Sequence, residues 1–453
     1  MKIQNLLILM ALVSVSTPLS AQTYNVIHNF TNSPDGAWPK AGLALSGGTL
    51  YGVTDSGGTN GDGMVFKVGT NGTGYAILKS FTDLPDGSSP DASLIVAGDT
   101  LYGTTKLGGS IGYGTVFKIN TNNGTGYSIL KNFSSYDTNI GAWPSGKLVL
   151  DSGVLYGTVS TGGNSNRGAV FKINTDGNGF TLLKSFYQND GWNPQAGVAL
   201  DGGTLYGTTY QGGTNGYGVV FKVNTNGTGF AVLKTFSDSD GSSPRGGVVV
   251  TGGVVYGTTY SGGSSGAGTV FKVNTDGTGF SILKHFNHSD GWHPQGGLIL
   301  NGNTLYGTTY DGGSSYNGNI FKIKLDGTGF SSVYSFTGSS GGANPLGDLV
   351  LDSSTLYGTT GYGGSASRGV VFSLTLPPPP WICCDSKFGV LTNCFGFDVA
   401  GTSNQVVVVD ACSNLTAANW LPRQTNTLGT NLLYFKDSSW TNYSMQFYRV
   451  REP

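Results

Sequence analysis

Leu205-Tyr206-Gly207-Thr208-Thr209 is the stretch that decides the fold, because this string or a close variant of it recurs along the chain. Its tyrosine falls at positions 51, 102, 156, 206, 256, 306 and 357, which gives intervals of 51, 54, 50, 50, 50 and 51 residues. A fixed period of this length is typical of a solenoid, a propeller or another repeat array. The sequence therefore predicts seven copies of one structural unit.

Each copy alternates short apolar segments with turns. Asn-Gly and Asp-Gly between such segments favour hairpins, because both residues tolerate positive φ. Four short antiparallel strands without a helical pattern are expected for one blade of a β-propeller. In the copy at Gly297–Phe336 the segments are Leu298–Leu300, Leu305–Thr309, Ile320–Ile323 and Phe330–Phe336.

The two ends of the repeat region predict a closed ring. The seventh copy stops at Val370–Leu376 without a fourth strand, and the segment Tyr24–Phe30 before the first copy matches that missing strand. If Tyr24–Phe30 completes the last blade, no sheet edge is left exposed for pairing with other chains. An open solenoid needs no such exchange, so we expect an all-β, seven-bladed propeller over residues 22–376.

Several further stretches carry a family resemblance: Gly212-Gly213, Val220–Asn224 and Gly227–Phe230, together with the Leu205–Thr209 string. With their equivalents in other copies, they resemble the GloVer (Gloeobacter/Verrucomicrobia-type) tandem repeat over residues 24 to about 376. The resemblance implies an exported protein of a family whose members end in varied surface anchors. It implies no particular activity.

The composition and the N-terminus indicate an exported protein. Only 11% of the residues are charged and the net charge is −1, so neither nucleic acid nor an anionic membrane surface is an expected partner. Lys2, the apolar run Leu6–Val15 and the small residues up to Ala21 describe a signal peptide over residues 1–21, with cleavage before Gln22. A membrane anchor is the alternative, but the apolar run is short for a span. We expect a secreted or cell-surface protein without membrane insertion, and a monomer.

The composition changes after a proline run. Residues 377–381 are predicted to be a stiff linker, and residues 382–453 a small antiparallel β-sandwich. The stretches Val409–Trp420, Gln424–Leu428 and Phe447–Val450 resemble C-terminal immunoglobulin-like modules of exported verrucomicrobial proteins.

All four cysteines lie in this C-terminal part of the chain. In an exported protein, Cys383, Cys384, Cys394 and Cys412 indicate one or two disulfides, with Cys394–Cys412 as the first pairing to test. A zinc site is the alternative, although this part of the chain contains no histidine.

Topology predicts which side of the ring carries a site. The loops between the second and third strands of each blade, and the connections from one blade to the next, lie on the same side, which we call the loop face. Functional residues of propellers usually sit on such loops. Features present in nearly every blade are expected to be scaffold. This applies to the Asp-Gly turns, in which the carboxylate is expected to bond backbone amides two residues later, at Asp35, Asp86, Asp190, Asp240 and Asp290, with Asp137 as a looser equivalent.

Aromatic residues break the repeat pattern on this face. Trp38, Trp143, Trp192 and Trp292 occupy the connections between blades, and tyrosines occupy the neighbouring loops. Flat rings with a polar edge suit sugar rings or a protein hot spot, although burial between blades would explain them equally. The preferred binding platform, which spans consecutive blades four to six, is Trp192, Tyr210, Tyr260, Trp292 and Tyr310.

No catalytic or cofactor constellation is found in the sequence. His285, His288 and His293 flank Asp290 and could form a metal site, but we assign no metal and no cofactor. There is no Gly-x-Ser-x-Gly elbow, phosphate loop or dinucleotide motif. The leading hypothesis is a non-catalytic binding protein for a glycan or an extracellular protein, with the sandwich as a spacer or attachment module.

Two alternatives stay open from the sequence. One is a hydrolase or lyase acting on polysaccharide through paired carboxylates at the mouth of the channel. The other is a structural surface protein without a specific ligand.

Overall fold

The computed structural model describes residues 22–134, 140–377, 381–383, 389–391, 394–402, 405–412, 420–429, 432–437 and 447–452. The chain divides into a unit of Tyr24–Thr375 and a unit that contains Leu376–Pro453. The predicted signal peptide and Asp137 lie outside the described residues. No helix long and apolar enough to cross a bilayer is found in the part of the chain that the structure describes.

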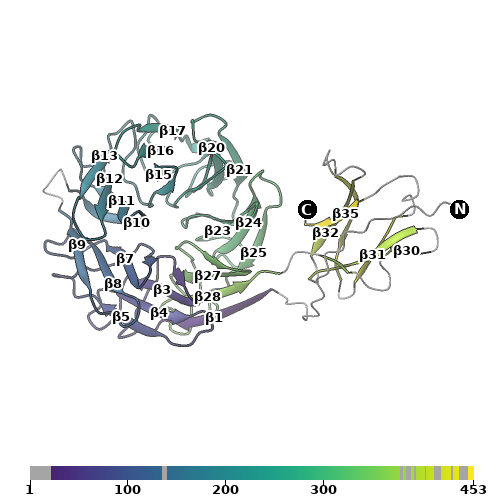
Figure 1. The fold of residues 1–453 in the computed structure, drawn as a ribbon, viewed down its shortest axis with the longest axis horizontal. Helices are drawn as coiled ribbons and strands as arrows, with labels where there is room; N and C mark the ends of the chain where they lie inside the picture. The colour runs from purple at the N-terminus through teal and green to yellow at the C-terminus, as the bar shows by residue number, and fades with distance from the viewer. Residues whose placement is uncertain are drawn as a thin grey trace. The chain divides into compact units, whose positions relative to one another are not determined.

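The unit Tyr24–Thr375 is a ring of four-stranded antiparallel sheets, which confirms the all-β propeller class (Figure 1). Seven such sheets occur among its described residues, each formed by consecutive strands except the last. The first three blades are β2 (Ala44–Ser46), β3 (Thr49–Thr54), β4 (Met64–Gly69) and β5 (Ala76–Ser80); β6 (Ile95–Ala97), β7 (Thr100–Thr105), β8 (Thr115–Asn120) and β9 (Ser128–Asn132); and β10 (Ala142–Asp151), β11 (Val154–Thr161), β12 (Ala169–Asn174) and β13 (Thr181–Ser185).

The remaining blades repeat this plan. They are β14 (Ala199–Asp201), β15 (Thr204–Thr209), β16 (Val219–Asn224) and β17 (Ala231–Thr235); β18 (Val249–Thr251), β19 (Val254–Thr259), β20 (Thr269–Asn274) and β21 (Ser281–His285); β22 (Ile299–Asn301), β23 (Thr304–Thr309), β24 (Asn319–Lys324) and β25 (Ser331–Ser335); and β26 (Val350–Asp352), β27 (Thr355–Thr360), β28 (Val370–Thr375) and β1 (Thr23–Asn29). A short 3-10 turn, η1 (Asp238–Asp240), lies before β18.

The first strand of the chain belongs to the same sheet as the last three strands of the ring. In that sheet β1 pairs with β28, the third strand of the blade, so it takes the place that a fourth strand has in the other blades. The ring of Tyr24 on β1 stacks on Tyr334 of the preceding blade, with 4.1 Å between centroids. The N-terminal segment therefore completes the last blade and packs against the preceding one, and both are distant from it in sequence.

The hydrophobic core lies between consecutive blades and repeats around the ring. A fully buried phenylalanine after the fourth strand of one blade meets a fully buried phenylalanine on the third strand of the next, edge to face, with centroids 4.9–5.5 Å apart. Phe30 and Phe66 form this pair between the last and first blades, at 5.2 Å. The interface at which the ring closes thus has the same packing as the others, and the other pairs are Phe81–Phe117, Phe133–Phe171, Phe186–Phe221, Phe236–Phe271, Phe286–Phe321 and Phe336–Phe372.

A glycine before each third strand lets the next blade approach. At Gly168, with φ of +93°, a Cβ would come within 2.6 Å of Cδ of Pro194. Gly369 and Pro39 have the same relationship across the closing interface, at 2.7 Å. The recurring glycine therefore leaves space for the proline, and the proline packs the connection between blades against the preceding blade.

The C-terminal unit contains two small sheets. One consists of β29 (Trp381–Cys383), β30 (Gly389–Leu391), β31 (Cys394–Ala400) and β34 (Leu433–Asp437), and the other of β32 (Val406–Cys412), β33 (Leu421–Thr427) and β35 (Phe447–Arg451). Residues of both sheets, including Phe397, Val409 and Phe435, share one apolar core, as in a β-sandwich. Trp381, assigned above to the linker, is the first residue of β29.

The structure describes the backbone of three of the four cysteines, Cys383, Cys394 and Cys412. Cys394 begins β31 and Cys412 ends β32, so the two residues lie on different sheets of the sandwich. Cys384 and the side chains of all four cysteines lie outside the described residues, and the disulfide stays a prediction.

Candidate functional site

The connections between blades share one unusual backbone geometry on the loop face. The residue directly before the recurring proline has φ between +50° and +59° in every blade, and its amide donates to the preceding blade. For example, Asn193 donates to the carbonyl of Arg167 at 2.9 Å. This left-handed conformation costs roughly 1–2 kcal/mol for a residue with a side chain, and least for asparagine. The seven residues are Trp38, Ser89, Trp143, Asn193, Ser243, His293 and Asn344.

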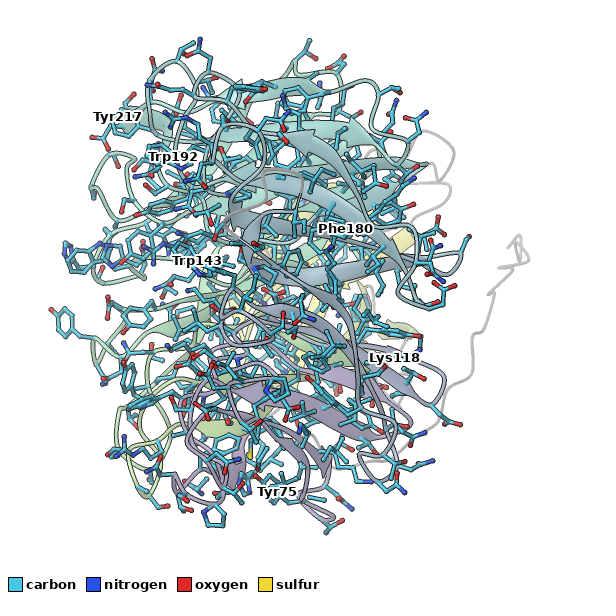
Figure 2. All side chains as sticks on the ribbon, turned by 90° about the vertical axis from the view of Figure 1, so that its left-hand side faces the viewer. Tyr75, Lys118, Trp143, Phe180, Trp192 and Tyr217 are labelled. Atoms are coloured by element: carbon cyan, nitrogen blue, oxygen red, sulfur yellow. The ribbon has the colours of Figure 1, made fainter. Side chains whose placement is uncertain are left out.

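The four loop tryptophans occupy two different positions within the connections between blades. Trp38 and Trp143 directly precede the proline, whereas Trp192 and Trp292 lie one residue earlier and pair with the loop after the second strand. The cause is a shift of one residue between Ala-Trp-Pro and Trp-Asn-Pro, so the tryptophan is the left-handed residue itself in the first and directly precedes it in the second. Trp143 and Trp192 are each 37% exposed, and both lie on the side of the ring that carries Tyr217 (Figure 2).

The residue directly after each proline lies at the central channel. These residues, which we call the post-proline ring, line a cavity of about 440 Å³ that all seven blades border. The scaffold around them repeats, but their side chains are basic, acidic, hydroxyl, amide or apolar. The members of the post-proline ring are Lys40, Asp91, Ser145, Gln195, Arg245, Gln295 and Leu346. Sequence analysis did not find them, although a column of dissimilar residues beside an invariant proline was visible in the repeats.

Several charges at the cavity are compensated locally. Lys40 pairs with Asp55 at 3.0 Å, and Asp91 pairs with Lys106 at 3.4 Å. Burial raises the pKa of Asp91 above its ordinary value, and Lys106 offsets only part of that rise. Asp348 also lines the cavity and accepts the amide of Gly297 at 2.6 Å.

Arg245 joins the cavity to the predicted aromatic platform. Its guanidinium carbon lies 4.0 Å from the ring centroid of Tyr260 and 4.9 Å from that of Tyr210. Nη2 donates to Oη of Tyr210 at 3.4 Å, and Nη1 donates to Oε1 of Gln295 at 3.2 Å. A cation held over aromatic rings is stabilised by their quadrupoles, so these residues from blades four to six form one cluster.

Tyr260 is covered on both ring faces. His293 stacks on it with 4.1 Å between centroids and 4° between planes. Arg245 lies equally close, so the two groups occupy opposite faces of the phenol ring. Tyr260 can therefore offer a ligand its hydroxyl edge, but no face for stacking on a sugar.

His293 links this stack to the remaining platform residues. Its ring packs on Trp292, with centroids 4.5 Å apart, and Nδ1 lies 3.2 Å from Oδ2 of Asp311. Burial lowers the pKa of His293 below its ordinary value, and Asp311 opposes this shift. Tyr310 donates its amide to the carbonyl of His293. Burial also raises the pKa of the Tyr310 phenol.

The structure thus connects four of the five platform residues and leaves the fifth apart. Tyr210, Tyr260, Trp292 and Tyr310 are linked through Arg245 and His293. Trp192 instead packs under Arg167 of the neighbouring blade, at 4.4 Å. Trp192 is the exposed member of the set, and only one of its faces is covered by that arginine.

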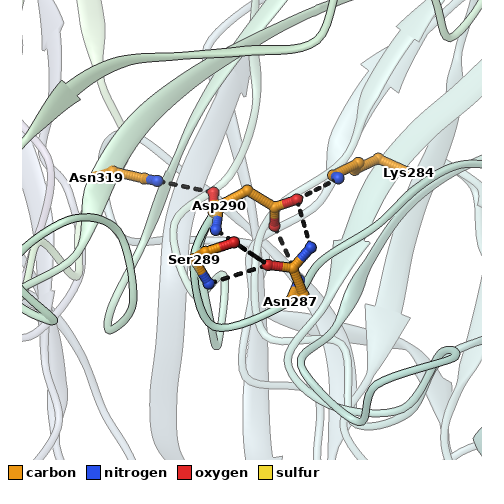
Figure 3. A network of polar contacts seen from close by, with 5 residues as sticks. All are labelled: Lys284, Asn287, Ser289, Asp290 and Asn319. Atoms are coloured by element: carbon orange, nitrogen blue, oxygen red, sulfur yellow. Dashed lines mark hydrogen bonds and ion pairs between the residues drawn. The ribbon is translucent and has the colours of Figure 1, made fainter.

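The recurring Asp-Gly aspartates act as turn residues. Asp290 accepts the amide of Asn287 at 2.8 Å and pairs with Lys284 on the preceding strand (Figure 3). The carboxylates therefore bond amides three or four residues earlier, and not two residues later as first expected. Lysine pairs of the same kind involve Asp86, Asp190 and Asp240, while Asp35 pairs with His28.

The three neighbouring histidines point to different partners. Nδ1 of His285 accepts the amide of Ser264 at 3.1 Å, and His288 packs on Trp292. His293 contacts Asp311, as described above. Among the described residues, no group of three metal-ligating side chains is close enough to hold an ion.

Solved structures similar to this chain are β-propellers. An oligogalacturonate lyase in complex with manganese is 13% identical, with a TM-score of 0.51, covering 80% of this chain and 98% of its own. A GH74 enzyme of Niastella koreensis is 15% identical, with a TM-score of 0.45, covering 86% of this chain and 66% of its own. TolB from Acinetobacter baumannii is 17% identical, with a TM-score of 0.35, covering 58% of each chain.

Comparison with curated proteins finds no match. None of the comparisons identifies an immunoglobulin-like module, so that part of the resemblance stays a prediction. The profile of the Gloeobacter/Verrucomicrobia repeat matches residues 13–216 and 193–407. The chain belongs to the Gloeobacter/Verrucomicrobia repeat family.

Proposed function

We propose that this chain is an exported, non-catalytic binding protein whose ligand, a glycan, sits at the mouth of the channel on the loop face. The observation that carries the proposal is the post-proline ring. Blade after blade, the same backbone delivers one side chain to one cavity, and the side chains differ. A cavity lined in this way presents an asymmetric set of donors, acceptors and charges, which is what selective recognition of a small ligand requires.

The chemistry of the surroundings favours a glycan over a folded protein partner. Ser145, Gln195 and Gln295 supply hydroxyl and amide groups that suit sugar hydroxyls, and Trp143 and Trp192 supply exposed rings beside them. The cavity is concave and its volume is within the usual range for small-ligand sites. A stable protein partner would instead need about 800 Å² of contact surface on this chain.

A glycan array probed with the mature protein tests this proposal. The double variant Gln195→Leu, Gln295→Leu introduces the residue that Leu346 already provides at the equivalent position, so folding should be unaffected. We expect this variant not to bind the glycans that the wild type binds. Asp201→Asn, in an exposed turn on the opposite side of the ring, is the matched control and should bind normally. Binding kept by the double variant would exclude the channel mouth.

One observation favours a second candidate, an enzyme acting on polysaccharide. Asp91 and Asp348 both line the cavity, and the raised pKa of Asp91 suits a proton donor. These two carboxylates, and not the Asp-Gly aspartates, would then be the acid and base pair. Release of new chain ends from a bound glycan by the wild type, and loss of that release in Asp91→Asn, would establish that the protein is an enzyme. Binding without cleavage would leave the binding protein.

A further inference from the structure

Arg245 lies in the wall of the cavity, and no carboxylate of the described residues pairs with its guanidinium. Its two hydrogen bonds go to neutral groups, the amide of Gln295 and the hydroxyl of Tyr210. Nε is buried and has no hydrogen-bond partner among the described residues. A guanidinium has more N–H donors than these two acceptors use, so part of its donor capacity is unused.

Three lysines of the loop face differ from Arg245 in this respect. Lys40 and Lys106 pair with aspartates, and Lys284 pairs with Asp290. The carboxylate of Asp311 is held by His293 at 3.2 Å and by Nδ2 of Asn344 at 3.1 Å, and it makes no ion pair with Arg245.

A second uncompensated cation lines the same cavity. Lys147 is exposed, and within the described ranges no carboxylate lies within ion-pair distance of it. Two cations of one cavity are therefore left without an anionic partner among the residues that the structure describes.

The surroundings of Arg245 hold the guanidinium in place. Tyr260 lies 4.0 Å below it, and Tyr260 is itself fixed by the stacked ring of His293. A positioned planar fork matches the geometry of a carboxylate, and little side-chain entropy remains to be lost on binding. A flexible lysine would be sufficient for general positive charge, but it would not provide this geometry.

We propose that the cavity binds a carboxylate through Arg245, assisted by Lys147, and that the ligand is a glycan containing uronic acid residues. This inference rests on the proposed glycan-binding function and specifies the class of sugar. The amides of Gln195 and Gln295 flank Arg245 in the post-proline ring and match the hydroxyls of a sugar ring that carries the carboxylate. The pairing of Asp91 with Lys106 limits the repulsion that an acidic ligand would meet across the cavity.

Isothermal titration of the full chain with a short oligomer of galacturonic acid tests the proposal. The same oligomer with its carboxylates methyl-esterified is the matched probe, because it has the same length and no charge. We expect the acid form to bind at least tenfold more tightly than the ester, and its binding to weaken as salt screens the charges. An oligomer of glutamic acid, which carries carboxylates on a peptide, should bind no better than the ester.

Variants locate the carboxylate site. Arg245→Gln should weaken binding of the acid form on the order of 10- to 100-fold, as expected for losing a hydrogen bond to a charged group, while Arg245→Lys should restore part of the affinity. Arg368→Gln is the matched control, because it removes an arginine of the same face that stacks on Trp38 and does not line the cavity. Lys147→Gln removes an exposed, unpaired side chain that the fold does not need, and it should reduce the salt dependence.

The outcomes separate the two proposals. Equal binding of acid and ester would overturn the carboxylate site and leave the glycan-binding function standing. The same holds if acid binding is unchanged in both Arg245→Gln and Lys147→Gln. Preferential binding of the glutamate oligomer would overturn the choice of a glycan. If the protein binds neither the acid nor the ester but binds unrelated neutral glycans on the array, only the uronic acid assignment is overturned.

Discussion

The imidazole of His293 lies parallel to the phenol ring of Tyr260, with 4.1 Å between their centroids and 4° between their planes. This stack joins the fifth and sixth blades, and Arg245 covers the other face of the same phenol. Burial lowers the pKa of His293, and the charge of Arg245 adds to this shift, whereas Asp311 opposes it. The stack therefore favours the uncharged imidazole.

Stability should therefore depend on pH through His293. Its folded pKa lies below the ordinary value of 6.5, so the unfolded chain binds the proton more readily. The contribution of His293 to the free energy of unfolding is fully present above pH 6.5, and it is lost as the pH falls through the lower folded pKa. Urea unfolding of the wild type between pH 7.5 and 5 should show this loss. His293→Asn, which copies Asn193 and Asn344 at the equivalent position, should show a flatter profile. The prediction fails if the two profiles are parallel.

Trp143→Asn should stabilise the ring. Trp143 has φ of +55° directly before a proline, a conformation that asparagine tolerates better, and its side chain is 37% exposed. We expect a gain of about 0.5–1 kcal/mol in the free energy of unfolding, measured from the denaturant midpoint. A loss of stability instead would mean that packing of the indole outweighs the strain. A gain in stability together with weaker ligand binding would assign the tryptophan to function.

Phe30→Ala should destabilise the ring as much as Phe186→Ala. Both rings are fully buried and pair edge to face with the next blade, Phe30 with Phe66 and Phe186 with Phe221. Each substitution should cost about 3–5 kcal/mol, the usual loss for a buried phenylalanine. The two variants can be compared by chemical denaturation at one temperature. A much smaller loss for Phe30→Ala would indicate that the N-terminal strand opens without unfolding the remaining blades.

Asp410→Asn should destabilise the sandwich. The carboxylate is buried in β32 and accepts Nε of Arg449 at 2.8 Å and Nε of Arg451 at 2.7 Å. Burial raises the pKa of Asp410, but the hydrogen bonds and charges of the two arginines together lower it by more. The folded pKa is therefore below the ordinary 3.8. The stabilisation is present above pH 3.8 and is lost as the pH falls through the folded value.

Hydrogen exchange of the full chain can measure this effect locally. At neutral pH, amides of β32 in Asp410→Asn should exchange faster by an amount that corresponds to about 1.5 kcal/mol, because two arginines that are 36–45% exposed lose a charged hydrogen-bond acceptor. Amides of a propeller strand such as β16 serve as the internal reference and should not change. Unchanged exchange in β32 would mean that the ion pair contributes nothing to local stability.

The propeller could be predicted from the sequence because its repeat, its turns and its core all depend on spacing. The string around Tyr206 fixes the period, and Tyr24–Phe30 resembles the absent strand closely enough to predict its pairing. The paired phenylalanines follow from the same alignment, since each lies at a fixed position of the repeat. Local pattern and global fold agree here, which is the usual condition for such a prediction.

The site could be predicted only in part, because it depends on directions of side chains across blades. Spacing identified Tyr210, Tyr260, Trp292 and Tyr310 as loop aromatics, but it did not show that Arg245 and His293 cover their faces. Arg245 lies between the aromatic rings of tyrosines from two different blades, and that contact is set by the curvature of the propeller. The post-proline ring was missed for another reason: unlike residues in one column look like tolerated variation until the structure shows that they share a cavity.

The separation between the buried phenylalanines and the post-proline ring has a consequence for evolution. Folding depends on a recurring core that none of the residues at the channel mouth enters. Selection can therefore exchange those residues one at a time, with little penalty in the folded population, and a lineage can acquire a new ligand while it inherits an unchanged scaffold. Related chains of this family should accordingly diverge fastest at the position that follows each recurring proline.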